Sequence, residues 1–452
     1  MKRFWFDTLM ATIFIFIVMY GVSKVTQLPQ VNAFDPISNA LADFDLSDFA
    51  FNKFRNDPDA KERELLDKIV IVNIGEQSRR EFALAFQNII KYKPRVVGVD
   101  GFYNCEGGIY DIENCPQLAD TLGNLLLASA FQQTKNLVLV SKLLQTDSLA
   151  EAGDFDFYDS IEVADEMFRL NAKNGYASLP TDAKYQEDVK ICKTFFPQRV
   201  VNKKKELAFG TQVAMLYDSV TTKKFLARNN TEEVINFVGN VEHEVVKLNS
   251  LKSQDLGTTD VNRKLSFLAL DVDDVINEKF EPSAIEDKIV LFGYLGSYIG
   301  DPAWEDKFFT PLNKKIGGRA NPDMFGLIVH ANIVATILSD DYIDVASQNL
   351  EYFIAFVVCF FNVALFSFIN KKWPVIYDGV GVLIQVIEIF LCGYAVITLL
   401  ADHHFKSTLG VTMGVLALVG PCYDLYAGLI KEGIEKLRKF WLTRKQKRVL
   451  KT

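Results

Sequence analysis

Four apolar runs constrain this 452-residue chain more than any other feature, because each is long enough to cross a lipid bilayer. One lies near the N-terminus, from Phe4 to Val22, and three follow one another near the C-terminus, over about residues 350–369, 375–400 and 409–430. An α-helix rises about 1.5 Å per residue, so roughly 20 apolar residues span a hydrocarbon core of about 30 Å. We therefore predict four transmembrane helices, one leading and three trailing.

The basic residues next to these runs predict the orientation, since cytoplasmic flanks carry an excess of Lys and Arg. Lys2 and Arg3 precede the first run, and the loop "NKKWP" separates the second and third. The tail from Lys431 has nine Lys or Arg against two Glu. We expect these segments to be cytoplasmic and residues 27–349 to lie outside, in the periplasm of a bacterium whose cytoplasmic (inner) membrane holds the chain. A cleaved signal peptide is the alternative for the first run, but no A-x-A site follows it.

The predicted organisation has four parts: an anchor over residues 1–26, an extracytoplasmic domain over 27–349, a three-helix bundle over 350–430 and a basic tail over 431–452. The net charge of the whole chain is −8, so without the basic tail the remainder carries about −15. We expect the lipid bilayer to be a partner and nucleic acid not to be one.

The six cysteines fall into two groups. Three lie in the predicted spans, where they pack as small apolar residues. Cys105 and Cys115 enclose the short loop "EGGIYDIEN" in a compartment where disulfides persist. We predict that these two are bonded, with a bond from either of them to Cys192 as the rival.

Strand-like and helix-like segments alternate between the anchors. The runs "DKIVIVNIG", "PRVVGVDGF", "KNLVLVSK", "EVINFVG" and "DKIVLFGYLG" predict strands. The segments "QSRREFALAFQNIIKYK", "PQLADTLGNLLLASAFQQT", "KKKELAFGTQVAMLYDS" and "PDMFGLIVHANIVATILS" predict helices. This alternation favours an α/β domain with a largely parallel sheet, and we expect the acidic stretch over about residues 145–201 to leave the sheet as an excursion.

Three segments resemble a known family. "VVGVDGFY", "NGYASLPTDAKYQEDVK" and the long run from Lys288 to Ile343 look like the type-two CHASE sensory ectodomain, named for its association with cyclases and histidine kinases. The last segment holds the residues that carry most of the resemblance: Gly293, Asp306, Thr310, Pro311, Gly326, His330, Ala331 and Asn332. The family also places this domain after one span and before three. The resemblance covers roughly residues 1–430 and implies a sensory role.

The chain departs from the family in two places. Where the family tends to have Asp-Gly-x-x-Arg, this sequence reads Glu187, Asp188, Val189 and Lys190, which puts any ligand contact there in doubt. Family members usually continue into a cyclase, kinase or cyclic-dinucleotide domain, whereas this sequence ends after the basic tail. We therefore expect the effector to be another protein.

Two residues of the predicted domain invite a ligand-binding interpretation. Asp100 ends a strand, where α/β sheets often hold ligands, although capping the following turn is the plainer role and the one we favour. His330 lies in an apolar helix, where it is either a pH sensor or metal ligand or, as we favour, a structural histidine that closes the domain over "TPL". We expect no metal or cofactor site, because the adjacent His403 and His404 have only Asp402 nearby.

Polar residues inside the predicted spans are a further signal. Glu388 falls near the centre of the third span, Gln385 lies one turn away, and Asn362 lies at a comparable depth on the second. Because an unpaired carboxyl group in hydrocarbon is costly, we expect Glu388 to face protein and to bond Asn362. Contact with a partner helix and a proton path are the two alternatives.

The sequence lacks the common catalytic and nucleotide-binding motifs, so we expect no catalytic residues and no enzyme activity. The favoured function is a membrane-anchored sensor or binding module that acts through a separate envelope or cytoplasmic protein. The alternative is a structural subunit of a cell-envelope complex that serves as a docking platform. The tail either lies against the anionic inner leaflet or docks a cytoplasmic partner. Neither the ligand nor the oligomeric state follows from the sequence.

Overall fold

The computed structural model describes residues 2–26, 46–51, 60–105, 115, 119–146, 158–181, 190–241, 266–302, 304–313, 321–431 and 433. The chain forms two compact units. The sheet unit comprises Asn56–Ile343, and the helical unit comprises Met1–Arg55 together with Asp344–Thr452. The described residues 46–51 and 344–349 therefore group with the helices, whereas the sequence analysis assigned them to the extracytoplasmic domain. Most of the predicted basic tail lies outside the described residues.

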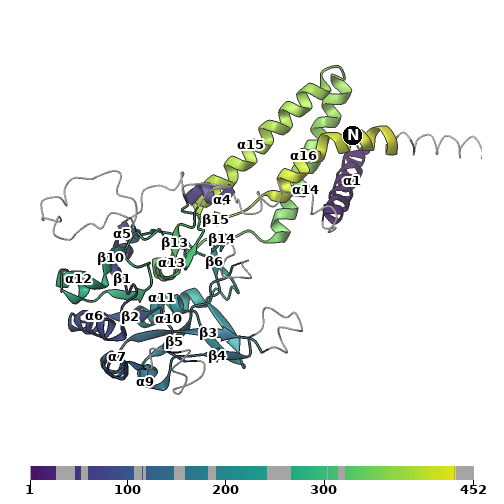
Figure 1. The fold of residues 1–452 in the computed structure, drawn as a ribbon. Coiled ribbons are helices and arrows are strands. Elements are labelled where there is room, and N and C mark those ends of the chain that lie inside the picture. Colours follow the sequence, from purple (N-terminus) through teal and green to yellow (C-terminus); the bar gives the residue numbers. More distant parts are fainter. Residues whose placement is uncertain are drawn as a thin grey trace, which may run out of the picture. The chain divides into compact units, whose positions relative to one another are not determined.

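A seven-stranded sheet forms the centre of the sheet unit, in the order β10-β1-β11-β2-β3-β4, with β5 also paired to β3 (Figure 1). Its strands are β1 Ile69–Asn73, β2 Val96–Val99, β3 Leu137–Leu144, β4 Ser160–Glu162, β5 Lys173–Tyr176, β10 Leu268–Asp271 and β11 Ile289–Gly293. Between these strands every pairing is parallel except that of β3 with β4. The central strands β1, β2 and β11 are buried along their full length, as parallel strands covered on both faces should be. The predicted α/β class is confirmed.

Helices cover both faces of this sheet (Figure 1). One face carries α6 Arg79–Lys91, α7 Thr121–Gln133, α9 Glu166–Arg169 and α12 Val272–Ile276. The other carries α5 Ala60–Lys68, α10 Phe209–Tyr217 and α13 Gly326–Ser339, with α11 Ser219–Leu226 packed on α10 and α13. Side chains alternate along each strand, so Val70 and Val72 point into the core under α6. On the opposite face Gly98 permits close approach of α10, because a Cβ there would lie 2.8 Å from the Phe209 ring.

The predicted helix α6 shows how local sequence and packing agree. Ser78 caps its first turn: its hydroxyl accepts a bond from the Glu81 amide, and the Glu81 carboxylate accepts one from the Ser78 amide. Phe82, Phe86 and Ile89 then follow at spacings of four and three residues, and all three are buried against the sheet. The amphipathic pattern and the capping box therefore fix the same helix.

Three sequence predictions for this unit are wrong in part. The segment predicted as one helix over residues 203–219 begins as strand β8 Lys204–Leu207, which pairs with β7 Gln198–Val201, and only then forms α10. The residues of "EVINFVG" give only the short strand β9 Glu233–Val234, which pairs with β6 Thr194–Phe195 outside the main sheet. The expected excursion over residues 145–201 instead supplies β4, α9 and β5 to the main fold.

The cysteines have the pairing expected from the sequence. Cys105 and Cys115 form a disulfide with their Cα atoms 5.9 Å apart. Cys192 is buried and free, and so are Cys359 and Cys422 in the helical unit. The disulfide closes the chain immediately after β2, at the carboxyl edge of the sheet.

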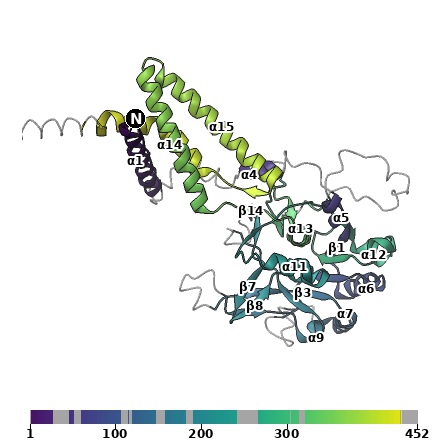
Figure 2. The same ribbon diagram turned by 180° about the vertical axis from the view of Figure 1, so that it is seen from behind.

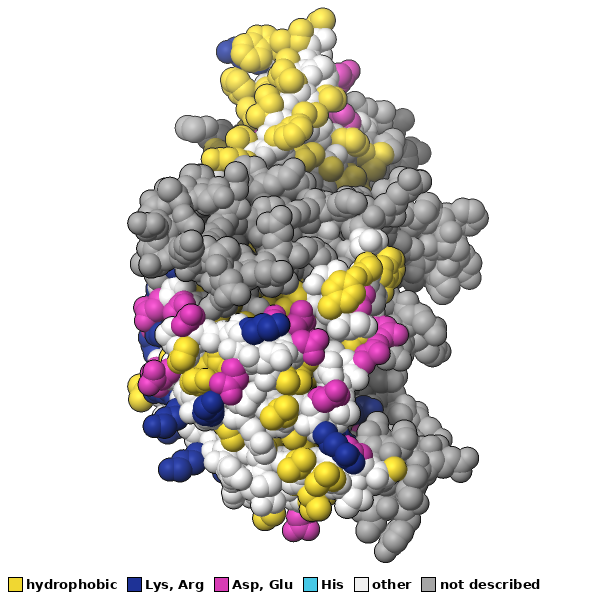
Figure 3. Space-filling model, turned by 60° about the vertical axis from the view of Figure 1, so that its left-hand side comes forward, with side chains coloured by type: hydrophobic (Ala, Val, Ile, Leu, Met, Phe, Trp, Pro, Cys, Tyr) yellow, Lys and Arg dark blue, Asp and Glu magenta, His cyan; other side chains and the backbone are white. Residues whose placement is uncertain are grey.

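The helical unit contains four helices that are long and apolar enough to cross a membrane, one N-terminal and three C-terminal, as predicted. The spans lie within α1 Lys2–Thr26, α14 Gln348–Lys372, α15 Tyr377–His403 and α16 Gly410–Leu425, the last continuing into the π-helical turn η7 Tyr426–Lys431. A short helix, α4 Leu46–Phe49, packs on α15. Helix α1 lies beside α14 and α16 (Figure 2). The visible surface of the helical unit is mostly hydrophobic, with few charged side chains, whereas acidic and basic side chains intersperse on the sheet unit (Figure 3).

Polar side chains bridge the helices of this unit. The Asn362 amide nitrogen donates to the Glu388 carboxylate at 2.9 Å, the contact that the sequence analysis expects. The Gln385 amide nitrogen donates instead to the Leu416 carbonyl oxygen at 2.7 Å, so it bonds the backbone of α16. Asp7 of α1 pairs with Lys431 at 2.8 Å, which ties the first helix to the end of the last. These bonds join α14 to α15, α15 to α16 and α1 to η7.

The entry into α14 is also bonded to the loop between α15 and α16. Strand β14 Asp344–Val345 runs parallel to β15 Phe405–Lys406. The Asp344 amide donates to the His404 carbonyl at 2.9 Å. One carboxylate oxygen of Glu351, in the first turn of α14, accepts bonds from the Ser407 hydroxyl at 2.7 Å and the Thr408 amide at 3.0 Å. The starts of α14 and α16 are therefore held together.

Candidate functional site

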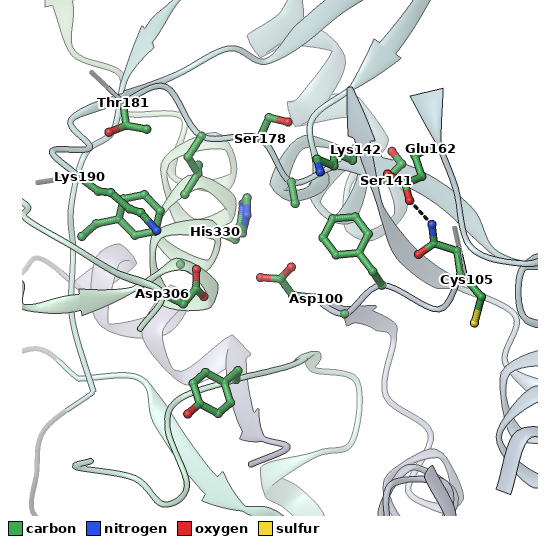
Figure 4. A pocket seen from close by; sticks show the side chains of 18 of the residues that line it. Asp100, Cys105, Ser141, Lys142, Glu162, Ser178, Thr181, Lys190, Asp306 and His330 are labelled. Carbon is green, nitrogen blue, oxygen red and sulfur yellow. Dashed lines mark hydrogen bonds between the residues drawn. The ribbon is translucent and has the colours of Figure 1, made fainter. Parts of the chain in front are cut away.

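A cavity of about 920 Å³ lies at the carboxyl edge of the sheet. Parallel strands bring residues that follow them to a common edge, and α/β proteins bind ligands there. The cavity is lined by Asp100 and Phe102 after β2, Ser141 and Lys142 of β3, residues 177–179 after β5, and Tyr294 after β11. Residues far apart in the sequence thus meet at one opening (Figure 4).

Four residues of the predicted family motif line this same cavity. Asp100 follows β2, Asp306 precedes strand β12 Lys307–Phe308, and Gly326 and His330 belong to α13. Strand β12 pairs with β13 Met324–Phe325, which leads directly into α13. This pairing places Asp306 at the N-terminus of α13. These four motif residues therefore form part of the cavity lining.

Gly326 has a steric reason to be glycine. A Cβ at this position would lie 3.1 Å from one Asp306 carboxylate oxygen and 3.3 Å from the Phe308 ring. The Asp306 carboxylate thus lies against the first residue of a 14-residue helix, where the helix dipole favours a negative charge. Asp306 itself has a φ of 56°, in the left-handed region. The backbone here is shaped to bring this carboxylate to the helix N-terminus.

The Asp306 carboxylate perturbs that of Asp100. Figure 4 shows the Asp100 and Asp306 carboxyl groups directed toward each other across the cavity. Burial raises the pKa of Asp100 to about 7, and the like charge of Asp306 adds to the rise. Asp306 keeps solvent contact through the opening, yet the protein around its carboxyl group raises its pKa to about 6. The charge of Lys190 and a bond from the Gly326 backbone oppose that rise.

His330 is the most buried ionisable group at the cavity, with 2% of its surface exposed. Burial lowers its pKa to about 4, against a hydrogen bond to the Ala177 backbone, so the ring is neutral. Its Nδ1 has no hydrogen-bond partner, and its ring meets that of Phe209 edge-to-face at 5.2 Å. His330 thus contacts α10 and the chain after β5, and its closing over the Thr310–Leu312 segment stays a prediction.

The remaining motif residues hold the fold and do not line the cavity. Thr310 donates from its amide and its hydroxyl to the Asp323 carboxylate, at 2.9 and 2.7 Å, and Pro311 next to it is buried. The buried Asn332 side chain accepts from the amides of Val238 and Gly239, and donates to the Gly239 carbonyl. Asn332 therefore fastens the chain at residues 238–239 to α13, and Thr310 fastens its own loop to Asp323, just before β13.

Sequence reasoning missed several residues of the site. Ser141 is among the residues that line the cavity; it is fully buried, and its hydroxyl has no hydrogen-bond partner. Lys190, the residue where the family resemblance expects arginine, also lines the cavity, with its ammonium 5.8 Å from the centre of the Phe308 ring. Only Lys190 had a signal in the sequence, namely its place in the departing motif. The other three residues of that motif, Glu187 to Val189, lie outside the described residues.

Within the described parts of the chain, no three His, Cys, Asp or Glu side chains are grouped so that they would hold a metal ion. A family model described as the CHASE2 domain matches residues 13–364 of the chain. Neither the curated proteins nor the solved structures contain a significant match.

Proposed function

The chain belongs to the CHASE2 domain family of sensory extracellular domains, and we propose that its sheet unit senses a small molecule bound in the cavity at the carboxyl edge. The role is one of binding rather than catalysis. A separate partner protein receives the signal.

The cavity is the observation that carries this proposal. Its volume of about 920 Å³ is in the range of small-molecule sites, which combine apolar walls with a few convergent polar groups. Ser141 and His330 supply such groups, because both are buried and each has a polar atom without a partner. Buried polar atoms are normally bonded, so unpaired ones in residues that line a cavity favour a bound ligand.

Membrane placement follows from the four apolar helices and the charge of their flanks. We propose the bacterial cytoplasmic membrane, with the sheet unit in the periplasm and the basic flanks in the cytoplasm. In the described part of the chain, the sheet unit leads directly into the membrane bundle. This supports transfer of the signal to another polypeptide through the helices or through a surface at the cytoplasmic side.

Blocking the cavity tests the sensing function. Ser178 lines the cavity with an exposed side chain, so Ser178→Trp should fill the space without disturbing the core. Ser283→Trp is the matched control, since Ser283 is exposed in a short 3₁₀ helix on another part of the unit. The full chain in mild detergent is screened against a small-molecule library by thermal unfolding. Sensing predicts stabilising compounds whose effect is lost in Ser178→Trp and kept in Ser283→Trp.

The docking-platform function predicts a different result. No library compound would then stabilise the chain through the cavity, and affinity purification from the native membrane would recover the same proteins with Ser178→Trp as with the unmodified chain. A ligand whose effect survives in Ser178→Trp would place the binding site elsewhere.

A further inference from the structure

Three side chains at the cavity can accept a hydrogen bond and have no partner for it among the described residues, namely Asp100, Ser141 and His330. The half-buried Asp100 carboxylate receives no hydrogen bond from the described residues, although it lies at the end of a strand where donors are common. The Asp306 carboxylate faces it across the opening (Figure 4). Two carboxylates that face one another repel unless a positive charge lies between them. Lys190 offsets part of the charge of Asp306, so Asp100 is the carboxylate of this pair that has no positive partner among the described residues.

Two of the nearby positive groups act on Asp306. The N-terminus of α13 is occupied by the Asp306 carboxylate, which lies against Gly326. The charge of Lys190 acts on the same Asp306 carboxylate. Lys142 also lines the cavity and lies opposite Glu162 in the pairing of β3 with β4, but among the described residues its ammonium forms no ion pair with Glu162. In the described part of the chain, no hydrogen bond or ion pair joins any of these groups to the Asp100 carboxylate.

His330 adds a neutral acceptor to the same wall. Its Nδ1 has no partner, and the bond to the Ala177 backbone favours a proton on the other nitrogen. A neutral imidazole protonated there presents a lone pair at Nδ1. With 2% of its surface exposed, the ring is held by the packing of α13 against α10 and is not free to turn into solvent. The buried Ser141 hydroxyl can also accept a bond.

From this arrangement we infer that the ligand is a small molecule carrying a protonated amine, whose N–H groups bond the Asp100 carboxylate and His330 Nδ1 within the cavity. The inference rests on the proposed function, since it assumes that the cavity is the binding site. An ammonium group has three donors and no acceptor, which matches the three unpartnered acceptors at the cavity. Phe102, Leu179, Tyr294 and Phe308 supply an apolar surface for the rest of the molecule.

Matched probes test the charge of the ligand. Ethylamine, 2-phenylethylamine and putrescine are each compared with the alcohol and the carboxylate of the closest skeleton, by calorimetry on the full chain in detergent. At least one amine is expected to bind about tenfold or more tightly than its alcohol and carboxylate counterparts, because a hydrogen bond between charged groups is stronger than a neutral one. Binding should weaken as the pH falls through about 7, where Asp100 becomes protonated.

Two variants locate the effect. Asp100→Asn keeps the shape of the side chain and should abolish both the preference for the amine and its pH dependence. Asp273→Asn makes the same change on the exposed surface of α12, outside the cavity, and should alter neither.

Three results would overturn the inference. Equal or tighter binding of the alcohols or carboxylates, lost in Ser178→Trp, would reject the amine and leave the cavity as the binding site. Amine binding that persists in Asp100→Asn would show that the Asp100 carboxylate does not bind the amine. Binding of no probe, together with no library compound lost in Ser178→Trp, would reject the inference and the proposed function together.

Discussion

Burial shifts the pKa values of Asp100 and His330 in opposite directions, and in both cases the shift favours the neutral form. A low-polarity environment disfavours the charged form of any group, so it raises the pKa of the acid to about 7 and lowers that of the base to about 4. The two residues lie in the same cavity wall but come from β2 and α13. The ligand must therefore stabilise a charge at Asp100 that the protein alone does not.

The pH dependence of stability follows from these shifts. A carboxyl group whose pKa rises from 3.8 to about 7 on folding takes up a proton more readily in the folded state. Its contribution to the free energy of unfolding is thus largest below pH 4 and is lost as the pH rises to about 7. Asp306 acts in the same sense up to about pH 6, whereas His330 acts in the opposite sense between about pH 4 and 6.5.

Asp100→Asn should therefore stabilise the unliganded chain at pH 8, because it removes a desolvated carboxylate that repels Asp306. A gain on the order of 1 kcal/mol is expected, or about 2–4 °C in melting temperature. The gain should vanish at pH 4, where Asp100 is protonated. Thermal melts of the full chain at both pH values check this, with Asp273→Asn as the control. A variant equally or less stable at pH 8 would show that the Asp100 carboxylate is paired in the folded protein.

The second residue-level prediction concerns Glu388. Glu388→Gln should be tolerated, since the amide oxygen of glutamine can still accept the bond from Asn362, whereas Glu388→Leu leaves the Asn362 amide without this partner. The leucine variant is expected to cost about 1 kcal/mol of bundle stability, as measured by unfolding in detergent. If glutamine proves as damaging as leucine, the carboxyl group itself is needed and a proton-carrying role becomes the better account.

The elements of the sheet unit differ in how much of their structure the sequence encodes locally. β1, β2, β3 and β11 were predicted because each is a run of apolar, mostly β-branched residues. β5, with the sequence "KNGY", has no such signal, and becomes a strand only because it pairs with β3. β10 is missing from the sequence predictions because it is only four residues long and half-buried. Its partner β1 lies nearly 200 residues away in the sequence.

The wrongly predicted helix start has a local explanation. Lys, Glu and Leu favour helices, so "KKKEL" looked helical. Asn202 and Lys203 have φ values of 48° and 65°, and a two-residue turn with both residues in the left-handed region suits a β-hairpin. Asn202 is the residue in the sequence that could have indicated this turn.

The site was harder to predict than the sheet, since Ser141 and Lys142 reach the cavity only through the order of the strands.

Helix α13 offers a test of how the site is held. Asn332→Ala removes the acceptor for the Val238 and Gly239 amides and the donor for the Gly239 carbonyl, all of them buried. Leaving such groups unpaired should lower the free energy of unfolding by about 2–4 kcal/mol. Asn136→Ala, which removes an exposed bond to the Arg95 carbonyl, is the control and should cost under about 1 kcal/mol. Chemical denaturation of the full chain measures both, and equal costs would contradict this role for Asn332.

For the whole molecule, the orientation in the membrane is the property that every functional proposal needs. A cysteine placed near Asn230, in the sheet unit, should react with a membrane-impermeant thiol reagent in intact cells, and one placed near Thr452 should not. The second should become reactive after the membrane is permeabilised, which controls for a site that is merely blocked. Labelling of both positions in intact cells would reject the topology, and with it the periplasmic sensor.

The bonds between β14 and β15 also decide how mechanical force would enter the membrane. A pull on Ile343 runs along β14, so its hydrogen bonds to β15 are loaded in shear and resist together. Glu351 fastens the same loop to the first turn of α14. The load is therefore divided between the start of α14 and the loop that joins α15 to α16. A displacement transmitted from Ile343 is therefore expected to move the start of α14 together with this loop, rather than α14 alone.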